Sequence, residues 1–167
     1  LVIGSILIVI YVTVRFEFVY AIAGIIALLH DVLVVFAVYA VLRIPLNSPF
    51  VAAMLTVVGY SINDTIVIFD RIRENLGLSK KNDLYGLINS SINQTVSRSI
   101  MTSATTLIVM VPMLLFTGSA IREFMLPLLI GVTVGTMSSI FMCSPVYYEL
   151  SNLTSKTPKY VGAKKGN

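Results

Sequence analysis

The fold is decided by the stretch FVYAIAGIIALLHDVLVVFAVYAVL, which runs from Phe18 to Leu42. Its only acidic, basic or histidine side chains are His30 and Asp31, near the middle. As a helix that rises ~1.5 Å per residue, the stretch is long enough to cross the ~30 Å hydrocarbon core of a bilayer with some tilt. We therefore interpret it as a membrane span.

Four further apolar segments flank this span, which predicts an all-α, polytopic transmembrane helix bundle with five spans. The expected spans are 1–14, 18–42, 49–69, 98–116 and 123–150, and together they form a transmembrane domain over residues 1–150. The first is truncated, because 14 helical residues cover only ~21 Å of the ~30 Å core. We therefore expect that further chain belongs upstream of Leu1, on the outer face of the membrane.

The composition supports a lipid environment and excludes several kinds of site. Charged residues make up 12% and hydrophobic residues 56% of the chain, whereas a soluble domain has about 25% charged residues. One cysteine and one histidine leave no intrachain disulfide and no multi-histidine or multi-cysteine metal site. The chain has no nucleotide-binding glycine motif, and its basic residues do not form one patch. We expect no metal, no bound cofactor, no nucleic-acid partner and no enzymatic activity.

The distribution of cations predicts the orientation. A polar stretch over residues 70–97 is expected to be a loop with an amphipathic helix, because apolar residues recur there at helical spacing. Five spans place that loop and the basic tail 151–167 on one side, together with 10 of the 12 cations. Only Arg43 and Arg122 fall on the other side. By the positive-inside rule, the loop and the C-terminus are cytoplasmic.

Ionisable residues within spans are costly and are therefore candidates for function. Asp64 lies about 9 Å inside the cytoplasmic boundary of its span, and Arg98 enters the membrane from the same side. A polar stripe on one face of the fourth span contains Arg98 and Thr102, and Tyr60, Asn63 and Asp64 form a polar patch on the third.

We expect these two faces to meet, because a polar stripe in lipid must face protein or water. Burial would then favour the protonated form of Asp64 and the arginine its charged form. Such a carboxyl could carry a proton, and the alternative is a structural ion pair or polar contact between helices.

Two other features are weaker candidates. Asp31 lies in the middle of the second span and is a candidate for the proton pathway, although His30 beside it could simply hydrogen-bond within the bundle. Gly131 and Gly135 form a small-residue face in the fifth span. We expect them to let a neighbouring helix approach closely and to carry no chemistry.

Four motifs in this chain resemble those of SecF, a family of bacterial protein-export membrane subunits in the resistance-nodulation-division superfamily. The motifs are Val58-Gly-Tyr-Ser-Ile-Asn-Asp-Thr-Ile-Val-Ile-Phe-Asp-Arg-Ile-Arg-Glu-Asn75, Leu29-His-Asp31, Thr95-x-x-Arg98-Ser-Ile-x-Thr102-Ser103 and Gly131-x-x-x-Gly135-Thr-x-Ser-Ser139. The resemblance extends over essentially the whole chain up to Leu150.

The resemblance implies a first transmembrane helix and a periplasmic domain ahead of Leu1. It also implies partnership with SecD, association with the SecYEG channel, and use of the proton-motive force to assist preprotein translocation across the bacterial cytoplasmic membrane. In that family, Asp64 and Arg98 correspond to residues of the transmembrane proton pathway. Two alternatives remain at this point: a small-molecule exporter of the same superfamily, and a helix bundle with a purely structural role.

Overall fold

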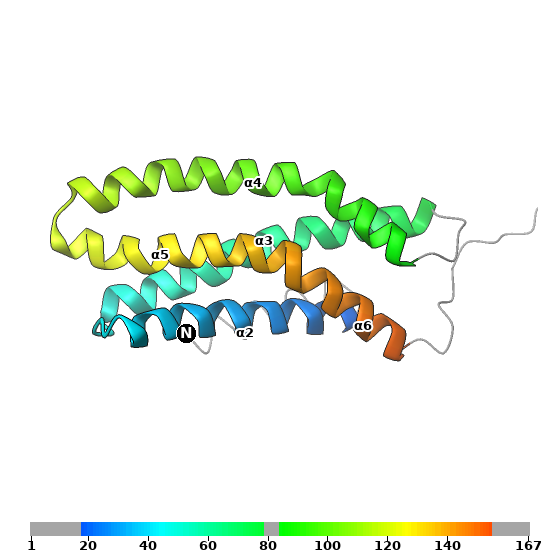
Figure 1. Ribbon diagram of the computed structural model, residues 1–167, viewed down its shortest axis with the longest axis horizontal. Helices are drawn as coiled ribbons and strands as arrows, with labels where there is room; N and C mark the ends of the chain where they lie inside the picture. Colours follow the sequence, from blue (N-terminus) through cyan, green and yellow to red (C-terminus); the bar gives the residue numbers. More distant parts are fainter. Residues whose placement is uncertain (1–17, 79–83, 155–167) are drawn as a thin grey trace, which may run out of the picture.

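The computed structural model describes residues 18–78 and 84–154, and these residues form a bundle of helices (Figure 1). The elements are α2 (Phe18–Val41), α3 (Ser48–Leu78), α4 (Leu84–Phe116), α5 (Ser119–Ser138), a π-helical segment η1 (Ser139–Cys143) and α6 (Ser144–Thr154). The expected span 1–14 lies outside the described residues, as do residues 155–167 of the expected tail.

The described part of the chain contains four helical stretches that are long and apolar enough to cross a membrane. They are Val19–Val41, Ser48–Gly77, Leu84–Phe116 and Ser119–Leu153. The predicted all-α, multi-pass membrane fold is therefore confirmed, with four of the five expected spans in view. In Figure 1 these helices run side by side along the long axis, and α3 packs against α2, α4 and α5. α5 likewise packs against α2, α3 and α4, so polar side chains of either α3 or α5 can meet several other helices.

Helices continue through most of the stretch that the sequence predicts to be a loop. α3 extends to Leu78 and α4 begins at Leu84, so both ends of the 70–97 segment are helical. The polar residues there join the two helices: Arg71 Nε donates to Gln94 Oε1 at 2.6 Å, and Asn75 Nδ2 donates to Ser91 Oγ at 2.7 Å. These polar residues therefore mark where the apolar part of each helix stops. They do not mark the end of the helix itself.

The connection between α2 and α3 is built from two local hydrogen-bonding devices. The Ile44 amide donates to the Tyr39 carbonyl and the Arg43 amide to the Ala40 carbonyl, with Arg43 at φ 52°. This is the Schellman pattern that ends a helix, in which the left-handed position usually holds glycine. At the start of α3, Asn47 Oδ1 accepts from the Phe50 amide at 3.0 Å. Asn47 therefore caps α3.

The last expected span is not one regular helix. It begins at Ser119, passes through η1, and continues as α6, whose axis diverges from that of α5 (Figure 1). An aromatic cluster fixes α6 against the beginning of α2 and the middle of the bundle. The rings of Tyr20 and Tyr147 stack at 4.3 Å between centroids, the Tyr147 hydroxyl donates to the Tyr20 hydroxyl at 2.9 Å, and Phe69 packs against both.

Candidate functional site

Asp64 is a buried carboxyl group on α3. It lies within the span formed by α3 and is 5% exposed. Its Oδ2 atom has no hydrogen-bond partner among the described residues, and its side chain faces Ser99 of α4. Burying an ionised carboxylate without full compensation costs several kcal/mol, so such a group readily takes up a proton. The predicted buried position of Asp64 thus agrees with the structure.

Arg98 occupies a different position from the one expected. It is exposed on the outside of α4 and, within the described part of the chain, forms no ion pair with Asp64. The positive charge of Arg98 nevertheless attracts the ionised form of the Asp64 carboxyl group. The two residues are thus electrostatic neighbours and do not form a closed pair in this conformation.

The physical reason is the direction of the packed face of α4. The buried polar residues of this helix are Ser91, Thr95, Ser99 and Ser103, which follow one another at intervals of four. A row of residues at intervals of four is inclined to the helix axis, and helices that pack along such rows cross at an angle. The predicted stripe through Arg98 and Thr102 is parallel to the axis instead. Beyond Thr95, its residues Arg98 and Thr102 therefore lie outside the contact with α3.

Polar contacts between α3, α4 and α5 do occur at Ser103, the residue that follows Ser99 in this inclined row. The Tyr60 hydroxyl donates to Ser103 Oγ at 3.3 Å and lies 3.4 Å from Thr106 Oγ1. Ser103 Oγ in turn lies 2.5 Å from Thr136 Oγ1 of α5. The expectation that polar faces of the third and fourth spans meet therefore holds for Tyr60 and is wrong for Arg98 and Thr102.

Asn63 and Thr102, the other two predicted residues of the α3–α4 pathway, are both exposed on the surface of this bundle. The Thr102 hydroxyl donates to the carbonyls of Arg98 and Ser99 on its own helix, at 3.1 and 3.0 Å. Its hydrogen bonding is therefore satisfied locally. Asn63 has a polar side chain on the outside of a membrane span, where it requires protein or water as a neighbour.

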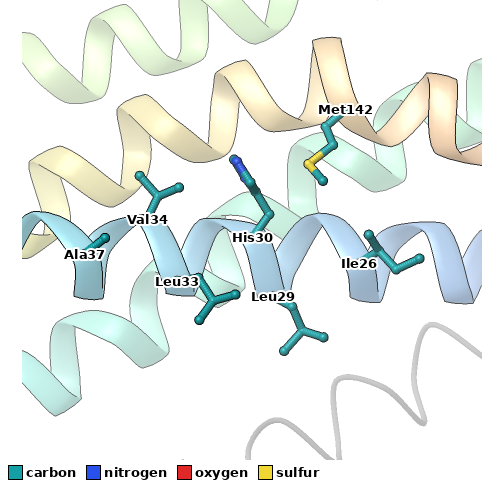
Figure 2. Close-up of a pocket in the computed structure, with 7 residues that line it drawn as sticks. All are labelled: Ile26, Leu29, His30, Leu33, Val34, Ala37 and Met142. Atoms are coloured by element: carbon teal, nitrogen blue, oxygen red, sulfur yellow. The ribbon is translucent and has the colours of Figure 1, made fainter.

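Asp31 is buried more completely than Asp64. Its side chain is 1% exposed, its Oδ2 accepts a hydrogen bond from Ser61 Oγ at 2.5 Å, and its Oδ1 lies 3.2 Å from His30 Nδ1. His30 is half-buried and lines an open apolar groove of about 500 Å³ together with Ile26, Leu29, Leu33, Val34, Ala37 and Met142. In Figure 2 its ring projects from α2 toward α5, between Val34 and Met142.

Gly131 and Gly135 both lie against α3. A Cβ atom at Gly131 would overlap the side chain of Val57, and one at Gly135 would lie 3.1 Å from the Cβ of Ser61 and 3.5 Å from Asp31 Oδ2. The two glycines therefore allow α5 to approach α3 closely. Gly135 also covers the hydrogen bond between Ser61 and Asp31, so it is closer to the polar groups than the sequence indicated.

Sequence reasoning missed several polar residues of this interior. They are Ser61, Thr65, Ser99, Ser103, Thr136 and Ser139. The sequence of α4 could have indicated them, because small hydroxyl residues recur there every four positions, at 91, 95, 99 and 103. Small residues on one helix face favour close helix packing, as was expected for the glycines of α5. Asp64 and Thr65 lie three and four residues after Ser61, so each is one helical turn away from it. Their partners come from other helices, which intervals within one helix do not identify.

Comparisons with known proteins agree with this arrangement. Residues 1–153 match the model of the family described as protein export membrane protein SecD/SecF, C-terminal. The chain is 48% identical over 160 residues to protein translocase subunit SecF of Sebaldella termitidis, covering 95% of this chain and 52% of the relative. It is 52% identical over 143 residues to SecF of Alicyclobacillus acidocaldarius, covering 84% of this chain and 46% of that protein. The chain thus spans about half the length of these relatives.

A solved structure shows the same fold. The crystal structure of SecDF from Thermus thermophilus, described as a translocon-associated membrane protein, superposes with a TM-score of 0.87 at 44% sequence identity. The match covers 90% of this chain and 21% of that one. With a family match over most of its length, relatives near half-identical in sequence and a shared helical bundle, the chain belongs to the family of the C-terminal membrane domain of the protein-export proteins SecD and SecF.

Proposed function

We propose that this chain is the membrane part of a SecF-type subunit, which uses the proton-motive force to assist preprotein translocation across the bacterial cytoplasmic membrane. The observation that carries the proposal is the Asp64 carboxyl, which is 5% exposed within a span and has an Oδ2 atom without a hydrogen-bond partner among the described residues. A membrane potential of 100 mV supplies ~2.3 kcal/mol per elementary charge that crosses. Proton binding at Asp64 would couple that energy to the helices around it.

In the proposed cycle, Arg98 favours the ionised form of Asp64 over the protonated form. While Asp64 is ionised, the guanidinium attracts it across the α3–α4 contact. When Asp64 takes up a proton, that attraction is lost, and the hydrogen bonds of Arg71, Asn75 and Tyr60 still join α3 to α4. A difference of ~2.3 kcal/mol shifts a two-state equilibrium by more than tenfold. The arrangement of α4 on α3 could therefore follow the protonation of Asp64.

SecD is the partner that we propose for the outer face of α3 and α4. Asn63 and Arg98 are exposed within spans on this bundle, and polar groups in a membrane face protein or water. The related protein of Thermus thermophilus is named protein translocase subunit SecDF, and this chain is 45% identical to it over 150 residues. The SecYEG channel and the preprotein are proposed as the further partners, in line with the role that the relatives' names describe.

The test is proton-driven preprotein translocation by the complete complex in sealed vesicles. Asp64→Asn keeps the shape of the side chain and removes its titratable proton, so it should abolish the stimulation by the proton gradient. Asp64→Glu should retain part of it, because a carboxyl group remains. Arg98→Ala should also impair the stimulation. Glu149→Gln neutralises an exposed carboxylate of α6 and serves as the matched control.

Two results would contradict the proposal. If the Asp64→Asn complex assembles normally and still responds fully to the gradient, Asp64 does not carry the coupled proton. If Asp64→Asn instead lowers assembly while the complex that forms still responds to the gradient, Asp64 has the structural role considered above.

A further inference from the structure

One buried hydroxyl group of α4 differs from its neighbours on the same helix face. The hydroxyls of Ser91 and Thr95 donate to carbonyls of their own helix, at 2.8 and 3.0 Å. Ser103 Oγ lies 2.5 Å from Thr136 Oγ1 of α5. Ser99 is buried as well, yet its Oγ atom has no hydrogen-bond partner among the described residues. Because an unpaired hydroxyl costs free energy when it is buried, we expect Ser99 to have a partner in the working protein.

The contacts between α3 and α4 place Ser99 opposite Asp64. The two helices run antiparallel (Figure 1), since later residues of α3 bond to earlier residues of α4. Tyr60 of α3 bonds to Ser103 of α4. One turn further, four residues along α3 and four residues back along α4, Asp64 therefore comes opposite Ser99. The two residues are 5% and 1% exposed, so each is an unpaired polar group buried against the other helix.

The groups that act on Asp64 come from two neighbouring positions of α4. Arg98 supplies the charge and Ser99 the hydroxyl group. Arg98 is exposed and forms no ion pair with Asp64 in the described part of the chain, whereas Ser99 belongs to the buried face. The hydroxyl is therefore the group that the packing of α4 directs toward the carboxyl.

A hydroxyl group can serve both protonation states of a carboxyl group, because it is a donor as well as an acceptor. When Asp64 is ionised, the Ser99 hydroxyl can donate to Oδ2. When Asp64 is protonated, its new O–H group can donate to Ser99 Oγ. The Ser99 hydroxyl then donates to the Thr95 carbonyl, four residues back, as Thr95 itself does to the Ser91 carbonyl. An arginine has donors only, so Arg98 can serve the ionised state alone.

We propose that Ser99 is the positioning residue of Asp64, whose carboxyl group it holds by one hydrogen bond in both protonation states. A small approach of α4 to α3 closes this bond. The effect on transport rests on the proposed proton-driven function, whereas the bond itself does not. Ser99 passes no proton on: it turns its own hydroxyl as the O–H bond of Asp64 forms and breaks.

Infrared difference spectroscopy of the complete complex, titrated with acid and base, tests the bond directly. A protonated carboxyl group has its own C=O stretching band, and Asp64→Asn identifies the band of Asp64 by removing it. Ser99→Ala should shift this band, because it deletes the hydrogen bond to that carboxyl. Ser99→Thr keeps the hydroxyl group and should leave the band close to its position in the parent protein.

Ser103→Ala is the matched control, because Ser103 is the next buried serine on the same face of α4. It loses the contacts of Ser103 with Tyr60 and Thr136, so it should weaken the assembled complex and leave the Asp64 band in place. Ser99→Ala removes a hydroxyl without a partner among the described residues, so assembly should be unchanged. A purely structural role of Ser99 would give no such contrast.

Gradient-driven preprotein translocation gives the second readout. Ser99→Ala should reduce the stimulation by the proton gradient on the order of tenfold, as expected for the loss of a hydrogen bond to a charged group. Ser99→Thr should recover most of it. The Glu149→Gln complex should respond like the parent.

The outcomes separate the two proposals. If Ser99→Ala leaves the Asp64 band in place, or if Ser99→Thr shifts it as far as Ser99→Ala does, Ser99 does not position Asp64. The proposed function then still stands where Asp64→Asn abolishes the response to the gradient. A full response of the Asp64→Asn complex would instead refute the proposed function, and the band shift alone would decide whether the bond exists.

Discussion

Single residues set how two neighbouring helices end and begin at the α2–α3 connection. Arg43 adopts φ 52° at the end of α2, a conformation that costs a residue with a Cβ roughly 1 kcal/mol relative to glycine. Asn47, four residues later, caps α3 through its Oδ1 atom and donates through Nδ2 to Glu123 Oε2 of α5 at 2.5 Å. The connection thus combines a strained helix end with a bond that ties it to a third helix.

We expect Arg43→Gly to stabilise the protein by about 1 kcal/mol, because glycine adopts this backbone conformation without steric cost. Arg43→Ala removes the same charge and keeps the Cβ atom, so it should give no such gain. Thermal unfolding in detergent would compare the two variants. If alanine stabilises as much as glycine, the effect comes from the arginine side chain and the strain argument fails.

Pairs of elements carry the close packing of the bundle, and α5 approaches α3 closely at Gly131 and Gly135. Gly131→Ala should destabilise the protein by ~1–3 kcal/mol, because the added methyl group would overlap Val57. Val57→Ala should also destabilise it, by leaving a cavity. The double variant should recover part of the loss, since the two changes compensate in volume. Additive losses in a double-mutant cycle would show that the two residues do not compete for space.

The same elements show what could be predicted from sequence. The apolar runs predict α2, α3, α4 and α5 as spans, because each helix is long and apolar enough to cross a membrane. The helix ends are harder to predict, because polar residues such as Arg71 and Asn75 continue α3 and bond across to α4. Asp64 is predictable as a buried carboxyl, since charge within a span is informative by itself. The outward position of Arg98 depends on the angle at which α4 crosses α3. The spacing of residues within one helix does not predict that angle.

On the outside of the bundle, α3 and α4 expose side chains that this bundle alone does not cover. α4 buries only a small share of its apolar window, and Asn63 of α3, like Arg98, is exposed within a span. Four of the five buried residues of α4 carry small hydroxyl side chains, namely Ser91, Thr95, Ser99 and Ser103. α4 has such contacts on one side and would face the proposed partner on the other. It is therefore well placed to move relative to α3. The proposed coupling at Asp64 lies at that contact.

The orientation of the whole molecule in the membrane gives the last prediction. α3 supplies a spanning stretch from Ser48 to Gly77, 30 residues or ~45 Å as a helix, so its two ends lie beyond opposite faces of the ~30 Å core. Most cations follow the Gly77 end in sequence or lie on its side, and the positive-inside rule places that end in the cytoplasm. In intact cells, an impermeant thiol reagent should therefore label Ser48→Cys, whereas Gly77→Cys should react only after the membrane is opened. Both positions are exposed, and the native Cys143 is fully buried and should stay unlabelled in the parent protein. Labelling of Gly77→Cys from outside, with Ser48→Cys protected, would invert the proposed orientation and place Asp64 nearer the outer face.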